Sequence, residues 1–257
     1  VASISTNSNK LVSFGRDAQG NPILHELAFG PFLSTQRHRE GYPLGGFWAI
    51  DVQRDENGRP ILGPDGVALL QPCPGWAPEV RDECKEEFIG PPFPTRMIGL
   101  TNTVRLFGNL QLYAFLDYQG GHYQWCAICS VRTRTDLNSK EINDPRLDPS
   151  HPEYESWGKY ELGLLRSAQT KRYIMPADFI KLREISATYT IPNRFAQRLR
   201  LSRASITLSG RNLWHWTKYE GNADPEVAFT STSSYETADY GAIPMQRWWT
   251  VGFTVQF

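Results

Sequence analysis

Residues 247–257, RWWTVGFTVQF, alternate large apolar side chains with small or polar ones. Successive side chains of a strand point to opposite faces of a sheet. One face of this stretch therefore carries Trp249, Val251, Phe253, Val255 and Phe257. The other face carries Thr250, Gly252, Thr254 and Gln256. Two environments suit such a strand: a soluble sheet with one face in a core, or a membrane barrel with lipid outside and water inside.

The bulk composition excludes little but sets useful bounds. The chain has 257 residues, with 27 basic and 27 acidic side chains and a formal net charge of zero, which gives no support for broad electrostatic binding to nucleic acid. No apolar run approaches the roughly 20 residues of a membrane-spanning helix, but barrel strands need only about ten alternating residues. The first residue is Val1, with no signal-peptide pattern after it, so we expect a processed product or a fragment.

Two apolar stretches predict a tight hairpin. Residues 95–108, TRMIGLTNTVRLFG, and residues 109–118, NLQLYAFLDY, each place most of their apolar side chains on one face. Gly108 and Asn109 lie between the two runs and form a short turn signal.

Further strands are expected at residues 178–192 and 204–216, joined by a short helical turn, and long polar segments occupy residues 122–176 and 220–245. Short turns that alternate with long loops are typical of up-and-down outer-membrane barrels. A β-sandwich has more evenly spaced turns.

The four cysteines form two close pairs, Cys73 with Cys84 and Cys126 with Cys129. Paired cysteines in loop-like sequence favour disulfides in an oxidising compartment. A zinc site that uses all four is the alternative, but the spacing of the first pair is wide for a zinc knuckle. We expect disulfides or free thiols, and no metal.

Candidates for catalysis are weak. Asp224 and Glu226 flank Pro225 and are better explained as a turn than as a catalytic or calcium-binding pair. His122, His151 and His215 show no metal-ligand spacing, and no serine-protease triad is identifiable. We therefore expect no enzyme activity and no cofactor.

Aromatic residues in the predicted loops are the candidates for ligand binding, because aromatic rings stack on sugars and on apolar side chains of peptides. They are Tyr123, Trp125, Trp157, Tyr235 and Tyr240. The alternative, that these rings pack the loops together, is favoured by the residues alone.

Five segments together resemble the SusC/RagA-type TonB-dependent outer-membrane receptors and look like the last barrel strands of that family. They are residues 39–52 (REGYPLGGFWAIDV), 88–106 (FIGPPFPTRMIGLTNTVRL), 178–192 (DFIKLREISATYTIP), 209–227 (SGRNLWHWTKYEGNADPEV) and 239–257 (DYGAIPMQRWWTVGFTVQF). The block from GRNL to DPE, followed by a terminal phenylalanine strand, carries most of the likeness. The cysteine pairs lie outside the family pattern.

The resemblance implies an all-β fold: an antiparallel up-and-down transmembrane β-barrel with long extracellular loops. Residues 1–257 would supply only its C-terminal strands, an incomplete barrel without a plug domain, because about seven strands of a barrel of about 22 cannot close. It also implies that the outer-membrane insertion machinery recognises the terminal strand through Thr250, Gly252, Val255 and Phe257.

The implied function is TonB-dependent uptake of oligosaccharides or peptides across the outer membrane of a Gram-negative bacterium. The implied partners are a SusD-like surface lipoprotein, outer-membrane lipid, and the TonB complex, which would engage an N-terminal region without a counterpart here. A secreted β-sandwich carbohydrate-binding module is the alternative, and a soluble enzyme comes third.

Overall fold

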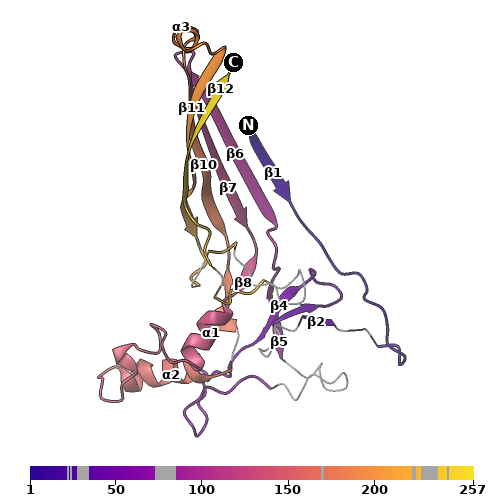
Figure 1. Cartoon of the computed structure of the whole chain (residues 1–257). Coiled ribbons are helices and arrows are strands. Elements are labelled where there is room, and N and C mark those ends of the chain that lie inside the picture. The colour runs from indigo at the N-terminus through magenta and orange to yellow at the C-terminus, as the bar shows by residue number, and fades with distance from the viewer. Residues whose placement is uncertain are drawn as a thin grey trace.

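A long antiparallel sheet stands on a cap of small sheets and helices in the computed structural model (Figure 1). The structure describes residues 1–21, 23, 25–27, 35–72, 85–168, 171–221, 224–226, 237–241 and 243–257. Phe257 and the short helix α3 (Asn193–Ala196) lie at the end of the sheet that is remote from the cap.

The long sheet contains six strands in the order β1-β6-β7-β10-β11-β12, so neighbours in space are successive along the chain within this sheet. The strands are β1 (Ala2–Thr6), β6 (Arg96–Leu106), β7 (Leu110–Gly120), β10 (Phe179–Thr190), β11 (Arg203–Thr217) and β12 (Trp248–Gln256). Every pairing is antiparallel. The order is that of an up-and-down meander, and strand β1 was not expected from the sequence.

The predicted hairpin is present as β6 and β7. Leu106 pairs with Leu110, and residues 107–109 form the turn, one residue more than the Gly-Asn step suggested. Gly108 has a φ of 74°, which a residue without Cβ adopts at little cost. Phe107 has a φ of 52° and is 95% exposed at the tip.

The strand registers place the apolar positions of the long sheet on one face. Ile206 lies opposite Phe253, and Leu208 lies between Ala187 and Val251. Because side chains alternate along every strand, a slip of one residue would move a whole strand's apolar set to the other face.

Two small sheets form part of the cap. One has the order β2-β3-β4-β5, with β2 (His25–Leu27), β3 (Gln36–His38), β4 (Gly46–Ile50) and β5 (Glu86–Gly90), and the other pairs β8 (Tyr123–Trp125) with β9 (Ile174–Pro176). Residues 46–50 and 88–90, which we expected among the barrel strands, therefore lie in the cap instead, and that part of the prediction was wrong. An apolar run of five residues indicates a buried strand but not its sheet.

Helices occupy much of residues 127–173, where the sequence indicated only an irregular loop. They are α1 (Ala127–Arg134), η2 (Pro145–Leu147), η3 (Tyr154–Gly158, a π-helix), α2 (Lys159–Arg166) and η4 (Lys171–Tyr173), whereas η5 (Gln197–Leu199) follows α3 at the far end. Helices of eight residues or fewer leave little periodic signal. Gly163 further weakens the helical pattern of α2, but a Cβ there would lie 2.5 Å from Leu62, so the close packing requires glycine.

The core of the cap is small. It joins Phe47 and Ala49 of β4 to Trp125, Ala127, Tyr173, Ile174 and Ala238. Among the described residues, every helix is too short or too polar to cross a bilayer.

Candidate functional site

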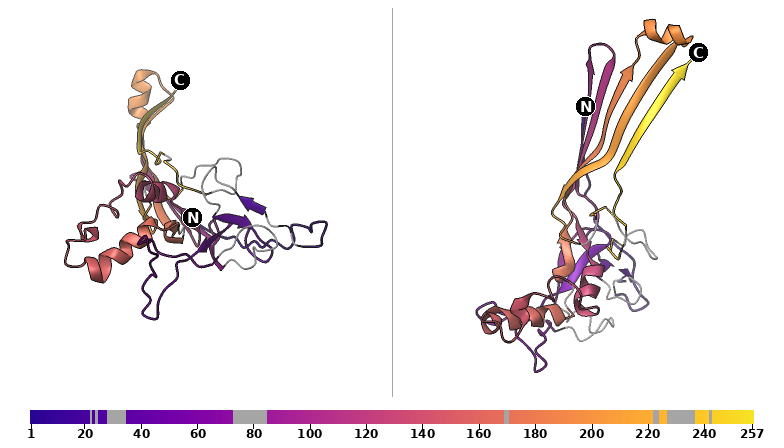
Figure 2. Two further views of the ribbon diagram at one scale, coloured as in Figure 1. Left: turned by 90° about the horizontal axis from the view of Figure 1, so that it is seen from below. Right: turned by 60° about the vertical axis from the view of Figure 1, so that its left-hand side comes forward.

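One broad face of the long sheet is apolar and open. Fourteen large apolar side chains on it are between 38% and 73% exposed. They are Ile98, Leu100, Val104, Leu112, Ile185, Tyr189, Ile206, Leu208, Trp214, Trp216, Trp249, Val251, Phe253 and Val255, and we call this set the apolar face. No described helix or strand lies over either side of the long sheet, as Figures 1 and 2 show.

Exposing an apolar face of this size to water is energetically unfavourable. Burying a side chain such as Val, Leu or Phe stabilises a protein by about 1.5–3 kcal/mol relative to leaving it exposed. Contiguous apolar patches beyond a few hundred Å² are rare on soluble monomers and mark contact with a membrane or another protein. The face therefore requires an apolar surrounding.

The opposite face carries mainly polar side chains, although Tyr113, Phe115 and Trp248 also lie on it. In the β10–β11 pair, Thr188 lies opposite Thr207 with their hydroxyl oxygens 2.9 Å apart, and Thr207 lies opposite Gly252 of β12. Thr250 lies opposite Ser209 on the same face. Small hydroxyl side chains of this kind suit a surface in water, so the two faces of the sheet differ in polarity.

A charged network sits on the polar face near the cap. Lys181 of β10 has no exposed surface and forms ion pairs with Asp224 and Glu226, which follow β11 in a separate segment. Arg183 also pairs with Glu226, through a 2.6 Å hydrogen bond from Nη1, and with Asp117 of β7 at 2.5 Å. The network joins two strands of the sheet to residues 224–226.

The charged network contains one feature that the sequence predicted, a turn at Asp224, and one that it did not, the ion pairs. The predicted turn at Asp224 is present, because the Asp224 carboxylate accepts a hydrogen bond from the Glu226 backbone at 3.0 Å. The ion pairs were not predicted. Burial acts to raise the pKa of Glu226, but hydrogen bonds from Arg183 and Lys181 outweigh it and lower the pKa below its usual value.

His122 lies next to this network, at the start of the cap, and is 6% exposed. Burial lowers its pKa to about 4, against an opposing influence of the Asp178 and Glu226 carboxylates. Asp178 itself accepts a 2.7 Å hydrogen bond from the Gly121 backbone and pairs with Lys218 at 3.2 Å. His122 is therefore a neutral, packed side chain at neutral pH.

The predicted ligand-binding aromatics divide into three groups. Trp125 is 3% exposed within the cap core, and Tyr123 and Tyr240 pack against that core. Trp157 lies in η3 with the Arg146 guanidinium 4.1 Å from its ring centre. Tyr235 lies outside the described residues. The structure thus gives three of these rings a packing role in the cap.

The cysteines are partly placed. Cys126 and Cys129 are joined by a disulfide at the start of α1, where the Cys126 sulfur also accepts a hydrogen bond from the Cys129 backbone at 3.3 Å. Cys73 and Cys84 lie outside the described residues, and their pairing stays a prediction.

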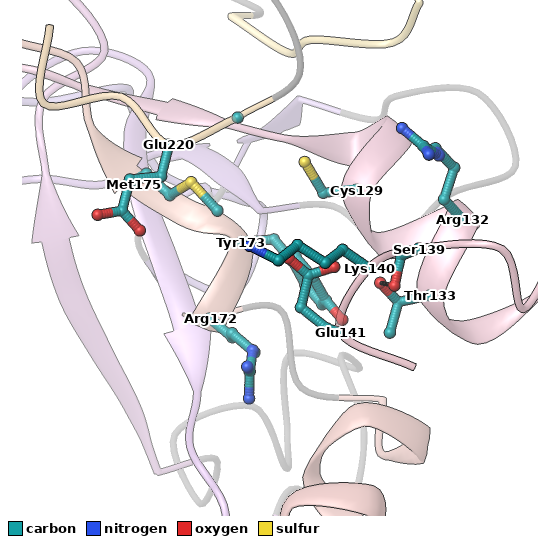
Figure 3. Close-up of a pocket in the computed structure, with 11 residues that line it drawn as sticks. Cys129, Arg132, Thr133, Ser139, Lys140, Glu141, Arg172, Tyr173, Met175 and Glu220 are labelled. Atoms are coloured by element: carbon teal, nitrogen blue, oxygen red, sulfur yellow. Dashed lines mark hydrogen bonds between the residues drawn. The ribbon is translucent and has the colours of Figure 1, made fainter. Parts of the chain in front are cut away.

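A cavity of about 370 Å³ opens beside this disulfide (Figure 3). Arg132 and Thr133 from α1 line one side, and Tyr173, Met175 and Glu220 line the other. A second cavity of about 460 Å³ shares Lys140, Glu141 and Arg172 with it and reaches Trp157.

The two cavities form a mixed-charge groove in the cap. Arg172 is paired with Glu161 at 2.5 Å, and an arginine of this kind can also bind a carboxylate or phosphate. The sequence did not indicate this groove, because its lining residues come from segments between residues 129 and 221.

The fold and these surfaces define a class of protein: an open up-and-down sheet with one apolar and one polar face, capped at one end. No protein-family profile matches the chain. A curated relative, TonB-dependent receptor P3 from Formosa agariphila, is 24% identical over an alignment 287 residues long, which covers 98% of this chain and 26% of the relative.

Solved structures agree in fold. The structure of the RagAB peptide transporter matches with a TM-score of 0.62 and 19% identity, over 91% of this chain and 24% of that one. The RagAB peptide importer in the open-open state matches with a TM-score of 0.60 and 17% identity, over 100% and 26%. The chain spans about a quarter of the length of these relatives. The predicted resemblance is confirmed: the chain is similar to a part of SusC/RagA-type TonB-dependent receptors.

Proposed function

We propose that this chain forms part of the wall and the extracellular cap of a TonB-dependent β-barrel in the outer membrane of a Gram-negative bacterium. The observation that carries the proposal is the apolar face, whose side chains stay 38–73% exposed while the opposite face is polar. Lipid would cover the first face and water the second, as in outer-membrane barrels.

Strand length supports the same proposal. The five longer strands of the sheet contain 9 to 15 residues. A tilted strand needs about 9–11 residues to cross the hydrocarbon core. Trp214, Trp216 and Trp249 lie on the apolar face toward the cap, where an aromatic belt would meet the headgroups.

The proposed activity is uptake of oligosaccharides or peptides, with a SusD-like lipoprotein at the cap and the TonB complex acting through another part of the receptor. The relatives named as a TonB-dependent receptor and as a peptide transporter support this role. The mixed-charge groove that runs from Tyr173 to Trp157 is the proposed ligand contact, because it offers aromatic rings and both signs of charge. The chain would contribute binding surface and no chemistry.

The wall assignment is tested by moving a charge between faces. In the full-length protein, Phe253→Arg puts the charge on the apolar face, and Thr254→Arg puts it on the polar face one residue away. Arginine facing lipid at mid-membrane costs about 2–4 kcal/mol. We expect the first variant to reach the outer membrane at a much lower level and the second to stay close to wild type.

Equal assembly of both variants would contradict the wall assignment. A sandwich module instead needs a second sheet over the apolar face, and within the described residues none is present.

Uptake is tested separately in cells that carry the full-length receptor and its neighbouring lipoprotein. Labelled peptide and oligosaccharide pools are supplied with and without TonB, and the variant Arg172→Gln is compared with Arg166→Gln, which lies on α2 outside both cavities. We expect TonB-dependent uptake of one pool, reduced only by the Arg172 change. Receptor-independent uptake of both pools would contradict the transport proposal.

A further inference from the structure

The end of the long sheet remote from the cap has an unbalanced charge. Three segments form it: residues 104–112, 187–205 and 250–257. They contain five arginines and no aspartate or glutamate, although the whole chain has a net charge of zero. We call Arg105, Arg194, Arg198, Arg200 and Arg203 the arginine rim.

Hydrogen bonds hold these segments together at one level of the sheet. The Thr190 backbone donates to the Asn109 carbonyl at 2.8 Å, and the Ser202 backbone donates to the Gln256 carbonyl at 2.7 Å. Figure 1 shows α3 and the C-terminus at the same end. The five charges therefore belong to one edge of the wall.

The rim arginines are exposed, and their guanidinium groups are free to bind an anion. None of the five has an ion-pair partner among the described residues, and Arg105 donates only to the Gln111 side chain, at 3.3 Å. The Arg194 and Arg198 guanidinium groups lie 4.7 and 5.9 Å from the centre of the Phe195 ring, which leaves their nitrogen atoms open to an anion.

Exposed apolar side chains lie between these charges. Phe107 is 95% exposed, Leu199 71% and Phe257 90%, and Phe257 continues the alternation of the apolar face beyond Val255. Arginine binds phosphate through a planar fork of donors. Arginines interleaved with exposed Phe and Leu are the composition of a surface that lies in a headgroup layer.

We propose that Arg194, Arg198 and Arg200 of the arginine rim bind the phosphates of anionic lipid headgroups in the leaflet beside them, while Phe107, Leu199 and Phe257 enter the acyl boundary. Arg105 and Arg203 pair with Gln111 and Gln256 on the polar face and add to the positive potential of this edge. The inference rests on the proposed membrane wall and adds a lipid preference to it. Lipid fits this surface better than a soluble anion, because the charges border an apolar face that needs a membrane. By binding headgroups at the connections between strands, these arginines would fix the depth and tilt of the sheet in the membrane.

The test uses the full-length protein in vesicles of phosphatidylcholine, with spin-labelled phosphatidylglycerol or phosphatidylcholine as probes. One variant carries Arg194→Gln, Arg198→Gln and Arg200→Gln. A matched control removes three exposed charges from the cap side, Lys10→Gln, Arg16→Gln and Arg166→Gln. A third variant changes the three rim arginines to lysine and keeps the charge.

We expect the wild-type protein and the control to associate with phosphatidylglycerol more strongly than with phosphatidylcholine. In the glutamine variant, the ratio of association with phosphatidylglycerol to association with phosphatidylcholine should fall by at least about fivefold. A change of that size corresponds to the attraction of about one basic side chain for an anionic surface. The lysine variant should retain more of it, and added inorganic phosphate should not compete.

Insertion without lipid preference, or equal losses in the glutamine variant and the control, would overturn this inference alone. Competition by inorganic phosphate would assign the rim to a soluble anion and would overturn it as well. Failure to insert into any vesicle would overturn the proposed wall and the lipid inference together.

Discussion

The Lys181 ammonium forms an ion pair with the Asp224 carboxylate, 43 residues away along the chain, and neither side chain is more than 5% exposed. Lys181 belongs to a strand of the long sheet, and Asp224 belongs to the segment that returns from the cap. The pair thus couples the proposed membrane wall to the proposed extracellular surface.

Lys181→Met should loosen the cap without abolishing the sheet. It leaves the Asp224 carboxylate buried without its cation, and removing one partner of a buried pair costs about 3–5 kcal/mol. We expect faster amide hydrogen exchange at residues 217–221, 224 and 226 of the full-length protein in micelles, with little change in β6.

Lys218→Met is the matched control. Lys218 is 55% exposed and pairs with Asp178 at 3.2 Å, so its loss should cost no more than about 1 kcal/mol. Equal exchange in the two variants would contradict a structural role for the buried pair.

Removal of Phe257, or Phe257→Asp, should lower the amount of full-length receptor in the outer membrane. Phe257 ends the apolar alternation and belongs to the predicted insertion signal with Thr250, Gly252 and Val255. Gln256→Asn changes the polar face one residue away and should have far less effect. Quantitative blotting of outer-membrane fractions measures both, and equal levels in the two variants would refute the signal.

Acid should weaken the part of the cap that contains His122. The pKa of His122 is lowered to about 4 by burial, from an ordinary value of 6.5. Between pH 4 and pH 6.5, therefore, the His122 imidazole is mostly protonated in the unfolded chain and mostly neutral in the folded chain. The stabilisation is complete above pH 6.5 and is lost as the pH falls toward 4, by about 1.4 kcal/mol per pH unit.

The comparison of wild type with His122→Gln isolates this effect, because the carboxylates titrate in both. Hydrogen exchange at residues 119–125 should rise more steeply between pH 6.5 and 5 in the wild type. Parallel pH profiles would show that His122 titrates without penalty.

The disulfides are tested by mass mapping under non-reducing conditions. We expect a Cys126–Cys129 bond, as the structure has it, and a separate Cys73–Cys84 bond. The closeness of each pair along the chain and an oxidising compartment favour local pairing. Stoichiometric zinc bound to all four thiols would contradict both.

Local patterns in the sequence were enough to predict five of the six strands of the long sheet, but not β1, whose five residues include one large apolar side chain. The alternation in residues 247–257 and the hairpin around Gly108 depend on neighbours one or two positions away, and both are present in the structure. The resemblance to the receptor family depended on such segments in their order along the chain. Short helices such as α2 were missed, because eight residues around Gly163 carry no sustained period.

The sequence by itself determined the five longer strands of the long sheet and which side of each strand is apolar, because side-chain direction in a strand repeats every two residues. Only the tertiary structure decided that residues 46–50 belong to the cap, that Trp125 is buried there, and that Lys181 meets Asp224 and Glu226. Those outcomes depend on contacts between segments tens of residues apart. Such contacts are selected by packing and charge pairing in three dimensions, and no local periodicity records them.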